Sequence, residues 1–87
     1  MSNRNEELLI YLRIAVIGQT YAIAVTPAAS FRKLLRIFFN EIRANLRHLY
    51  LPDGEEKIIE KHTGMVCDPL VSLRTLGVKS GMTFLIF

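Results

Sequence analysis

The fold of this protein is decided by residues 72–87, SLRTLGVKSGMTFLIF. Ser72 is a favourable helix N-cap, Leu73 and Leu76 have the spacing of a single helical turn, and Gly77 is a favourable helix stop. Residues 82–87 then have the composition of a β-strand. Because this last segment is apolar on both faces, we expect it in the middle of a sheet and not at an edge.

Two strand-like runs near the start of the chain predict a β-hairpin. Residues 9–17 and 21–25 are rich in β-branched and aromatic side chains, and the turn residues 18–20, GQT, separate them. Side chains alternate between the two faces of a strand, so one set from each run is expected to face the core. These sets are Leu12, Ile14 and Val16 in the first run and Tyr21, Ile23 and Val25 in the second.

The middle of the chain predicts one long helix. Ser30 is a suitable N-cap for a helix that begins at Phe31, and Pro52 requires that it end before then, near Arg47 or His48. The apolar stripe of this helix consists of Phe31, Leu34, Leu35, Phe38, Ile42 and Leu46. Residues 57–61 then read as a strand, 62–64 as a turn and 65–67 as a very short strand.

The order of hairpin, helix, two short strands, helical turn and final strand is that of an α+β protein with a β-grasp domain. A chain of 87 residues has room for one domain. We expect residues 1–8 to form a disordered N-terminal tail and residues 9–87 to form the domain.

Composition favours a protein that binds a partner. Hydrophobic residues make up 51% of the chain, which is high for a small protein and predicts exposed apolar side chains that a protein partner or a homo-oligomer would cover. The longest apolar stretch, Leu8 to Ile17, spans about ten residues and contains Arg13, so it is too short to cross a membrane. The single cysteine and the lack of a signal-peptide pattern predict a cytoplasmic protein.

The closing pattern Leu73-x-x-Leu76-Gly77-Val78-x-x-Gly81-Met82-x-Phe84-x-Ile86, together with the hairpin and the capped helix, resembles ubiquitin-like domains. More narrowly, residues 57–87 are similar to the YukD/EsaB family of small bacterial ubiquitin-like proteins. This resemblance implies a cytosolic accessory of bacterial type VII secretion that acts by contact with a secretion-system component. It predicts no catalytic residue.

The residue pattern argues against an enzyme, a cofactor or a metal site. Ubiquitin and the related sulfur carriers act through a flexible Gly-Gly tail, whereas residues 84–87 belong to the predicted last strand, so we expect no conjugation. His48, His62 and Cys67 lack metal-binding spacing. A Cys67–His62 nucleophile pair is conceivable across the turn, but Cys67 is better explained as a small core residue. Glu60, with Glu55 and Glu56, is expected on a solvated edge.

The first candidate surface is a basic face of the helix. Arg32, Arg36, Arg43 and Arg47 lie within about 60° of one another at 100° per residue, and Phe39 lies between them and the apolar stripe. Arginines beside an exposed aromatic ring could bind an acidic protein, a nucleic acid or an anionic lipid. The alternative is a solvated face whose arginine stems cover apolar surface.

The second candidate surface is the sheet face that the helix leaves open. If Phe84 and Ile86 face the helix, Leu85 and Phe87 face away from it, and the same alternation places Ile59 and Ile17 with them. Ubiquitin-like domains carry an apolar recognition patch on this face, so the resemblance implies that Ile17, Ile59, Leu85 and Phe87 bind a protein.

Overall fold

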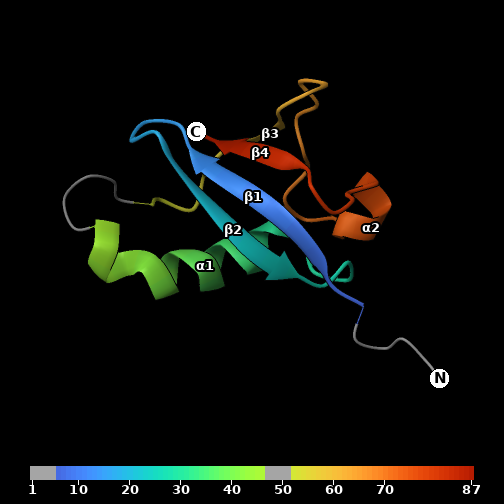
Figure 1. Ribbon diagram of the computed structural model, residues 1–87, viewed down its shortest axis with the longest axis horizontal. Helices are drawn as coiled ribbons and strands as arrows, with labels where there is room; N and C mark the ends of the chain where they lie inside the picture. The colour runs from blue at the N-terminus through green and yellow to red at the C-terminus, as the bar shows by residue number, and fades with distance from the viewer. Residues whose placement is uncertain (1–5, 47–51) are drawn as a thin grey trace.

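The computed structural model describes residues 6–46 and 52–87. A hairpin of β1 (Leu8–Ile14) and β2 (Gln19–Val25) precedes the long helix α1 (Phe31–Leu46). The strand β3 (Ile58–Glu60), the short helix α2 (Leu73–Leu76) and the strand β4 (Thr83–Ile86) follow. The strands form one sheet in the order β2-β1-β4-β3, with α1 across one of its faces (Figure 1). This is the predicted α+β architecture of a β-grasp domain.

The strand β4 lies in the middle of the sheet, as its sequence predicts. It runs parallel to β1, with Leu12 opposite Phe84, and antiparallel to β3, with Ile58 opposite Ile86. Phe84 and Ile86 are fully buried between the sheet and α1. The first and last strands of the chain therefore form the centre of the sheet.

The core lies between the sheet and the apolar stripe of α1. Ile10, Leu12 and Ile14 of β1 are completely buried, and Phe31 of α1 packs edge-on against Phe84 with 4.9 Å between ring centroids. The helix begins where predicted, because the Ser30 hydroxyl accepts a hydrogen bond from the Lys33 backbone N–H at 3.3 Å. Its predicted end, at Arg47 or His48, falls in residues 47–51, outside the described residues.

The predicted hairpin turn is wrong in position. The strand β1 ends at Ile14, whose carbonyl accepts hydrogen bonds from the N–H groups of Ile17 and Gly18, and residues 15–18 form the turn. Gly18 closes the turn with a positive φ of 67°, a conformation that glycine adopts without strain. Val16, predicted to face the core, is consequently 71% exposed at the turn.

Three other boundaries differ from the predicted ones. Leu8, assigned to the tail, is the first residue of β1, while residues 1–5 of that tail lie outside the described residues. Strand β3 covers only residues 58–60. The predicted strand at residues 65–67 is reduced to a single bridge between Ile59 and Val66.

Candidate binding surfaces

The open face of the sheet carries a row of residues in register across three strands. Leu85 of β4 lies opposite both Arg13 of β1 and Ile59 of β3, and Ile59 in turn bridges to Val66. Residues directly opposite each other share a face, so this row lies on the side away from α1. Leu85 and Ile59 are half-buried, and Val66 is 67% exposed.

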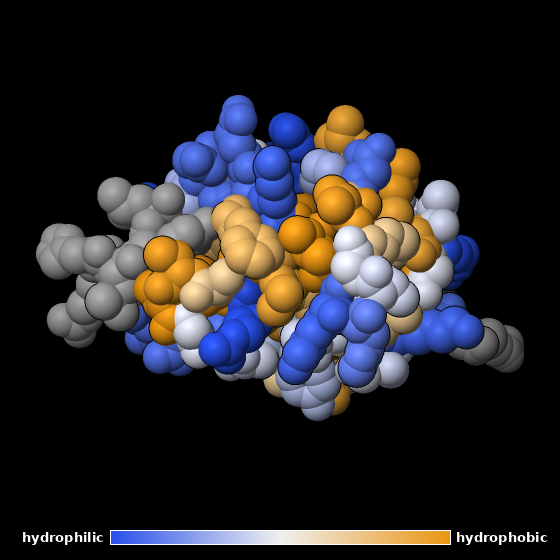
Figure 2. Space-filling model, turned by 90° about the horizontal axis from the view of Figure 1, so that it is seen from above, coloured by the Kyte–Doolittle hydropathy of each residue, from blue (hydrophilic) through white to orange (hydrophobic). Residues whose placement is uncertain are grey.

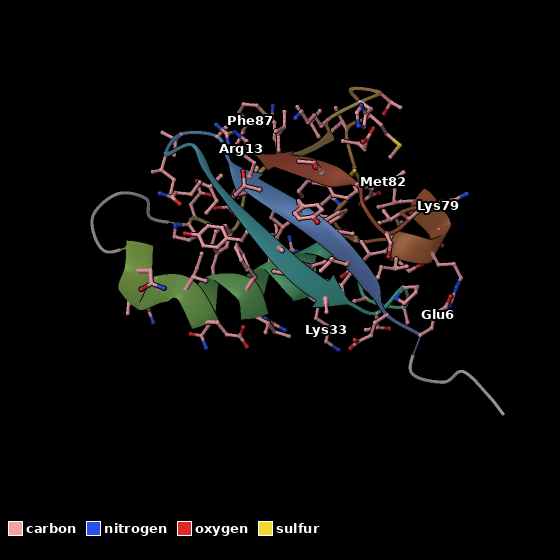
Figure 3. The ribbon with its side chains drawn as sticks, viewed as in Figure 1. Glu6, Arg13, Lys33, Lys79, Met82 and Phe87 are labelled. Carbon is pink, nitrogen blue, oxygen red and sulfur yellow. The ribbon has the colours of Figure 1, made fainter. Side chains whose placement is uncertain are left out.

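Phe87 extends this row at the end of β4. Its N–H and C=O both bond to the backbone of Lys57, at 2.9 and 3.0 Å, which holds the residue in line with the sheet. Alternation from Leu85 places its ring on the open face, where it is 55% exposed. Figure 3 shows Phe87 and Arg13 at the end of the sheet where β1 and β4 finish.

We call Ile59, Val66, Leu85 and Phe87 the open-face patch. Hydrophobic side chains form a band on the side of the molecule seen from above in Figure 2. Arg13 adjoins the patch, and its guanidinium donates a hydrogen bond to the Thr20 hydroxyl at 3.1 Å. The patch is thus apolar, with a cation fixed at its border.

Ile17, the fourth predicted member of this surface, does not belong to it. It lies in the hairpin turn and is half-buried against the hydrophobic core. The prediction was wrong because it extended the strand alternation of β1 past Ile14, where the strand stops. Val66 takes its place. The expectation that its neighbour Cys67 is a core residue was a signal in the sequence that Val66 points outward.

The structure describes three of the four arginines of the predicted basic face of α1. Arg32, Arg36 and Arg43 are exposed, while Arg47 lies outside the described residues. Phe39 is not an exposed aromatic at its border, because its ring is only 8% exposed and packs beside Phe38 with 5.3 Å between centroids. The core therefore reaches one residue further round the helix than the predicted stripe.

Glu60 is buried, contrary to its expected place on a solvated edge. It is 2% exposed, and its carboxylate accepts hydrogen bonds from the backbone N–H of His62 and from both the N–H and the hydroxyl of Thr63. These bonds, led by the one from the His62 backbone, lower the pKa of Glu60. The carboxylate therefore organises the turn that presents Val66.

Cys67 occupies the core position expected of a small apolar residue. Its burial, followed by the nearby negative charge of Glu60, raises the pKa of the thiol, so the thiol stays protonated at neutral pH. Within residues 6–46 and 52–87, no group of three or more acidic, histidine or cysteine side chains could hold a metal ion. In the same part of the chain, no helix is long and apolar enough to cross a membrane.

No protein-family model matches this chain, and no curated protein sequence matches it. Solved structures do. The ubiquitin of Caldiarchaeum subterraneum matches 93% of this chain and 91% of its own with a TM-score of 0.70 and 21% identity. The ubiquitin-like domain of Plasmodium falciparum Dsk2 matches 94% of this chain and 100% of its own, with a TM-score of 0.66 and 18% identity. A de novo designed protein based on ubiquitin matches 93% of this chain and 87% of its own, with a TM-score of 0.71 and 18% identity. The chain therefore has the ubiquitin-like β-grasp fold.

Proposed function

We propose that this protein is a non-catalytic binding module that docks a protein partner on its open-face patch. The observation that carries the proposal is the row of Leu85, Ile59 and Val66, three aliphatic side chains from three segments held in register on a face that α1 does not cover. A backbone ladder fixes their positions, so little conformational freedom is lost when a partner covers them.

The exposed members of the patch can supply useful binding free energy. Complete burial of a large aliphatic or aromatic side chain contributes about 1.5–3 kcal/mol before the cost of association. Val66 and Phe87 are the most exposed members, and Arg13 at the border can orient a partner that carries an acidic group. The expected partner is therefore a protein with an apolar contact surface.

The resemblance of residues 57–87 to the YukD/EsaB family supports a narrower proposal. The protein is a cytosolic accessory of bacterial type VII secretion, and its partner is a component of the secretion machinery. Binding is non-covalent in this proposal.

The test is capture of secretion-system components by purified protein from cells that encode them. The variant Val66→Ser/Phe87→Ser removes two exposed apolar side chains from the patch, and Val16→Ser removes one of similar exposure at the hairpin turn. Wild type and Val16→Ser are expected to retain the secretion ATPase or another component, and the double variant to lose it. Equal capture by all three proteins would refute docking on this patch.

The three exposed arginines of α1 support a second candidate, binding to a nucleic acid or another polyanion. Arg32, Arg36 and Arg43 share one helix face, and no described acidic side chain forms an ion pair with any of them. Fluorescence anisotropy with a labelled single-stranded oligonucleotide tests this. Affinity should fall steeply with salt and disappear in Arg36→Glu/Arg43→Glu; an affinity unchanged by that variant would exclude it.

A further inference from the structure

Residues 61–66, which we call the β3 turn, are anchored at the residue that precedes them. The backbone of Glu60 closes the turn, since its N–H donates to the Met65 carbonyl at 2.8 Å and its carbonyl accepts from the Gly64 N–H at 2.9 Å. The carboxylate of Glu60 closes it a second time, because it accepts hydrogen bonds from two residues inside the turn. Backbone and side chain of one residue therefore hold the same segment.

Thr63 carries the constraint from the carboxylate to the far end of the turn. Its hydroxyl donates to Glu60 at 2.8 Å and accepts a hydrogen bond from the Met65 N–H at 3.1 Å. With both bonds made, the hydroxyl has one orientation, and the chain of hydrogen bonds is continuous from the carboxylate to Met65. The next residue, Val66, bridges to Ile59 in the open-face patch. The position of Val66 is therefore tied to Glu60.

Burial of apolar side chains contributes little to holding the β3 turn closed. All of residues 61–66 are exposed, whereas Glu60 before them and Cys67 after them are each 2% exposed. A segment with few buried apolar contacts opens at a lower free energy than the whole domain unfolds. The closed form of the turn therefore depends on its hydrogen bonds to Glu60.

The charge on Glu60 sets the strength of those bonds. With its lowered pKa the group is ionised at neutral pH, and hydrogen bonds to an ionised acceptor are about twice as strong as neutral ones. The titratable side chains that act on this charge are His62 in the turn and Cys67 after it, while Phe84, opposite Glu60 on β4, is uncharged. Loss of one donor would leave a buried negative charge short of a partner, which costs more than the bond alone.

We propose that the β3 turn opens as a unit while the rest of the domain stays folded, and that Glu60 is the positioning residue that holds it closed. When the turn is closed, Val66 completes the open-face patch; when it is open, Ile59 loses this neighbour at the edge of the sheet. A partner that covers the complete patch binds only the closed form, so its affinity falls with the closed fraction. This control of docking rests on the function proposed above, whereas the opening itself does not.

Cys67 is a natural reporter of the opening. It is the single cysteine of the chain, its side chain is buried, and its thiol lies 3.9 Å from the Met65 carbonyl in the turn. A thiol reagent therefore reaches it when this segment moves away. The experiment measures the rate at which N-ethylmaleimide labels the full chain at neutral pH, by mass spectrometry, at urea concentrations below the unfolding transition. The wild-type rate is expected to vary little with urea, because local opening exposes little surface.

Thr63→Val and Thr63→Ser are a matched pair of variants for the turn. Valine has the shape of threonine without the hydroxyl, so it loses the bonds to Glu60 and Met65, whereas serine keeps the hydroxyl. Labelling of Cys67 is expected to be faster by about tenfold or more in Thr63→Val, and to keep its wild-type rate in Thr63→Ser. Both variants leave the Glu60 charge beside the thiol, so the contrast reports opening and not a change in thiol reactivity.

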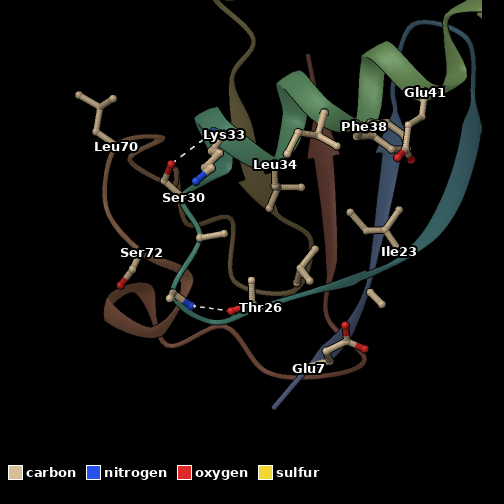
Figure 4. Close-up of a pocket in the computed structure, with 15 residues that line it drawn as sticks. Glu7, Ile23, Thr26, Ser30, Lys33, Leu34, Phe38, Glu41, Leu70 and Ser72 are labelled. Atoms are coloured by element: carbon tan, nitrogen blue, oxygen red, sulfur yellow. Dashed lines mark hydrogen bonds between the residues drawn. The ribbon is translucent and has the colours of Figure 1, made fainter. Parts of the chain in front are cut away.

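Val25→Ala is the control for unfolding of the whole domain. Val25 is buried in β2, where it lines the groove between β2 and α1 shown in Figure 4, and β2 is the edge strand on the opposite side of the sheet from β3. The substitution removes buried methyl groups and leaves the hydrogen bonds of the turn in place. Urea unfolding should shift to a lower midpoint, while labelling of Cys67 at low urea keeps its wild-type rate.

Two results would overturn the opening of the turn. Equal labelling rates in Thr63→Val and Thr63→Ser would show that the bonds to Glu60 do not hold it. Faster labelling in Val25→Ala, with a steep dependence on urea, would show that Cys67 is exposed only when the whole domain unfolds.

Capture of secretion-system components separates this inference from the function on which part of it rests. If wild type captures a component, Thr63→Val is expected to capture less of it than Thr63→Ser, and equal capture would refute the control of docking. If wild type captures none, the docking function fails, and the labelling rates still decide whether Glu60 holds the turn closed.

Discussion

The Glu60 carboxylate accepts hydrogen bonds from both the backbone N–H and the hydroxyl of Thr63, each at 2.8 Å. A third bond comes from the backbone N–H of His62 at 3.1 Å. A neutral carboxyl group would satisfy these donors less well, and this is why folding lowers the pKa of Glu60. The turn between β3 and Val66 therefore depends on a buried negative charge.

Replacement of Glu60 by glutamine is expected to destabilise the fold in a pH-dependent way. In the folded chain the lowered pKa favours the ionised form, so Glu60 contributes stability above its unfolded-state pKa that is lost as pH falls through the folded-state value. Urea unfolding of wild type and Glu60→Gln should differ at neutral pH and converge in strongly acidic solution. A difference that stays constant with pH would show that the charge plays no part.

Loss of the Phe84 ring is expected to be among the most damaging core substitutions. Phe84 is fully buried in the central strand and packs against Phe31, so Phe84→Ala should lower the free energy of unfolding by about 3–5 kcal/mol. Phe87→Ala serves as the matched control in the same segment, and it should cost less than about 1 kcal/mol because its ring is largely exposed. Chemical denaturation of both variants measures the contrast, and similar losses would contradict the assigned faces of β4.

Phe39 is expected to act as a core residue and not as a binding residue. Phe39→Ala should lower the free energy of unfolding by about 3 kcal/mol, whereas Ile37→Ala, two residues away and half exposed, should lower it by less than about 1 kcal/mol. Thermal unfolding of the two variants checks this order. A Phe39→Ala variant that unfolds like wild type and instead weakens polyanion binding would contradict the core role of Phe39.

Gly77 is expected to tolerate asparagine better than alanine. Its φ of 78° ends α2 in the left-handed conformation, while a Cβ added there would meet no other atom within 4 Å. The penalty of Gly77→Ala is therefore conformational, about 1–2 kcal/mol. Gly77→Asn should cost less, because asparagine adopts this conformation more readily. Urea midpoints rank the three proteins, and a larger loss for asparagine would point to a steric cause instead.

The element order followed directly from the sequence, but the hairpin register did not. A turn at residues 18–20 would have paired Ile17 with Tyr21, and so odd-numbered residues with odd-numbered ones. Yet the side chains predicted to face inward are even-numbered in the first strand (Leu12 and Ile14) and odd-numbered in the second (Tyr21 and Ile23). The two strands can share one inward face only if each even-numbered residue of the first pairs with an odd-numbered residue of the second. Only a turn with an even number of residues satisfies both strands, and the observed turn, residues 15–18, has four. The β-branched composition of residues 14–17 concealed this constraint.

Candidate sites were predictable where they depend on strand alternation and not where they depend on packing between elements. Alternation placed Ile59, Leu85 and Phe87 on one face without any knowledge of the tertiary structure. The burial of Glu60 could not be predicted without knowledge of the turn that follows it, nor that of Phe39 without knowledge of how the helix packs on the sheet.

The parallel pairing of β1 with β4 also sets when this domain can complete its fold. The strand at the centre of the sheet is the last one to be synthesised, so the hairpin and α1 leave the ribosome without the strand that closes their core. Until it arrives, the backbone groups that Tyr11 and Ala15 direct to this side of the hairpin have no partner strand, and the apolar core side chains of β1 stay partly uncovered. Completion of the sheet must therefore wait for β4, and it joins segments about 70 residues apart in the chain.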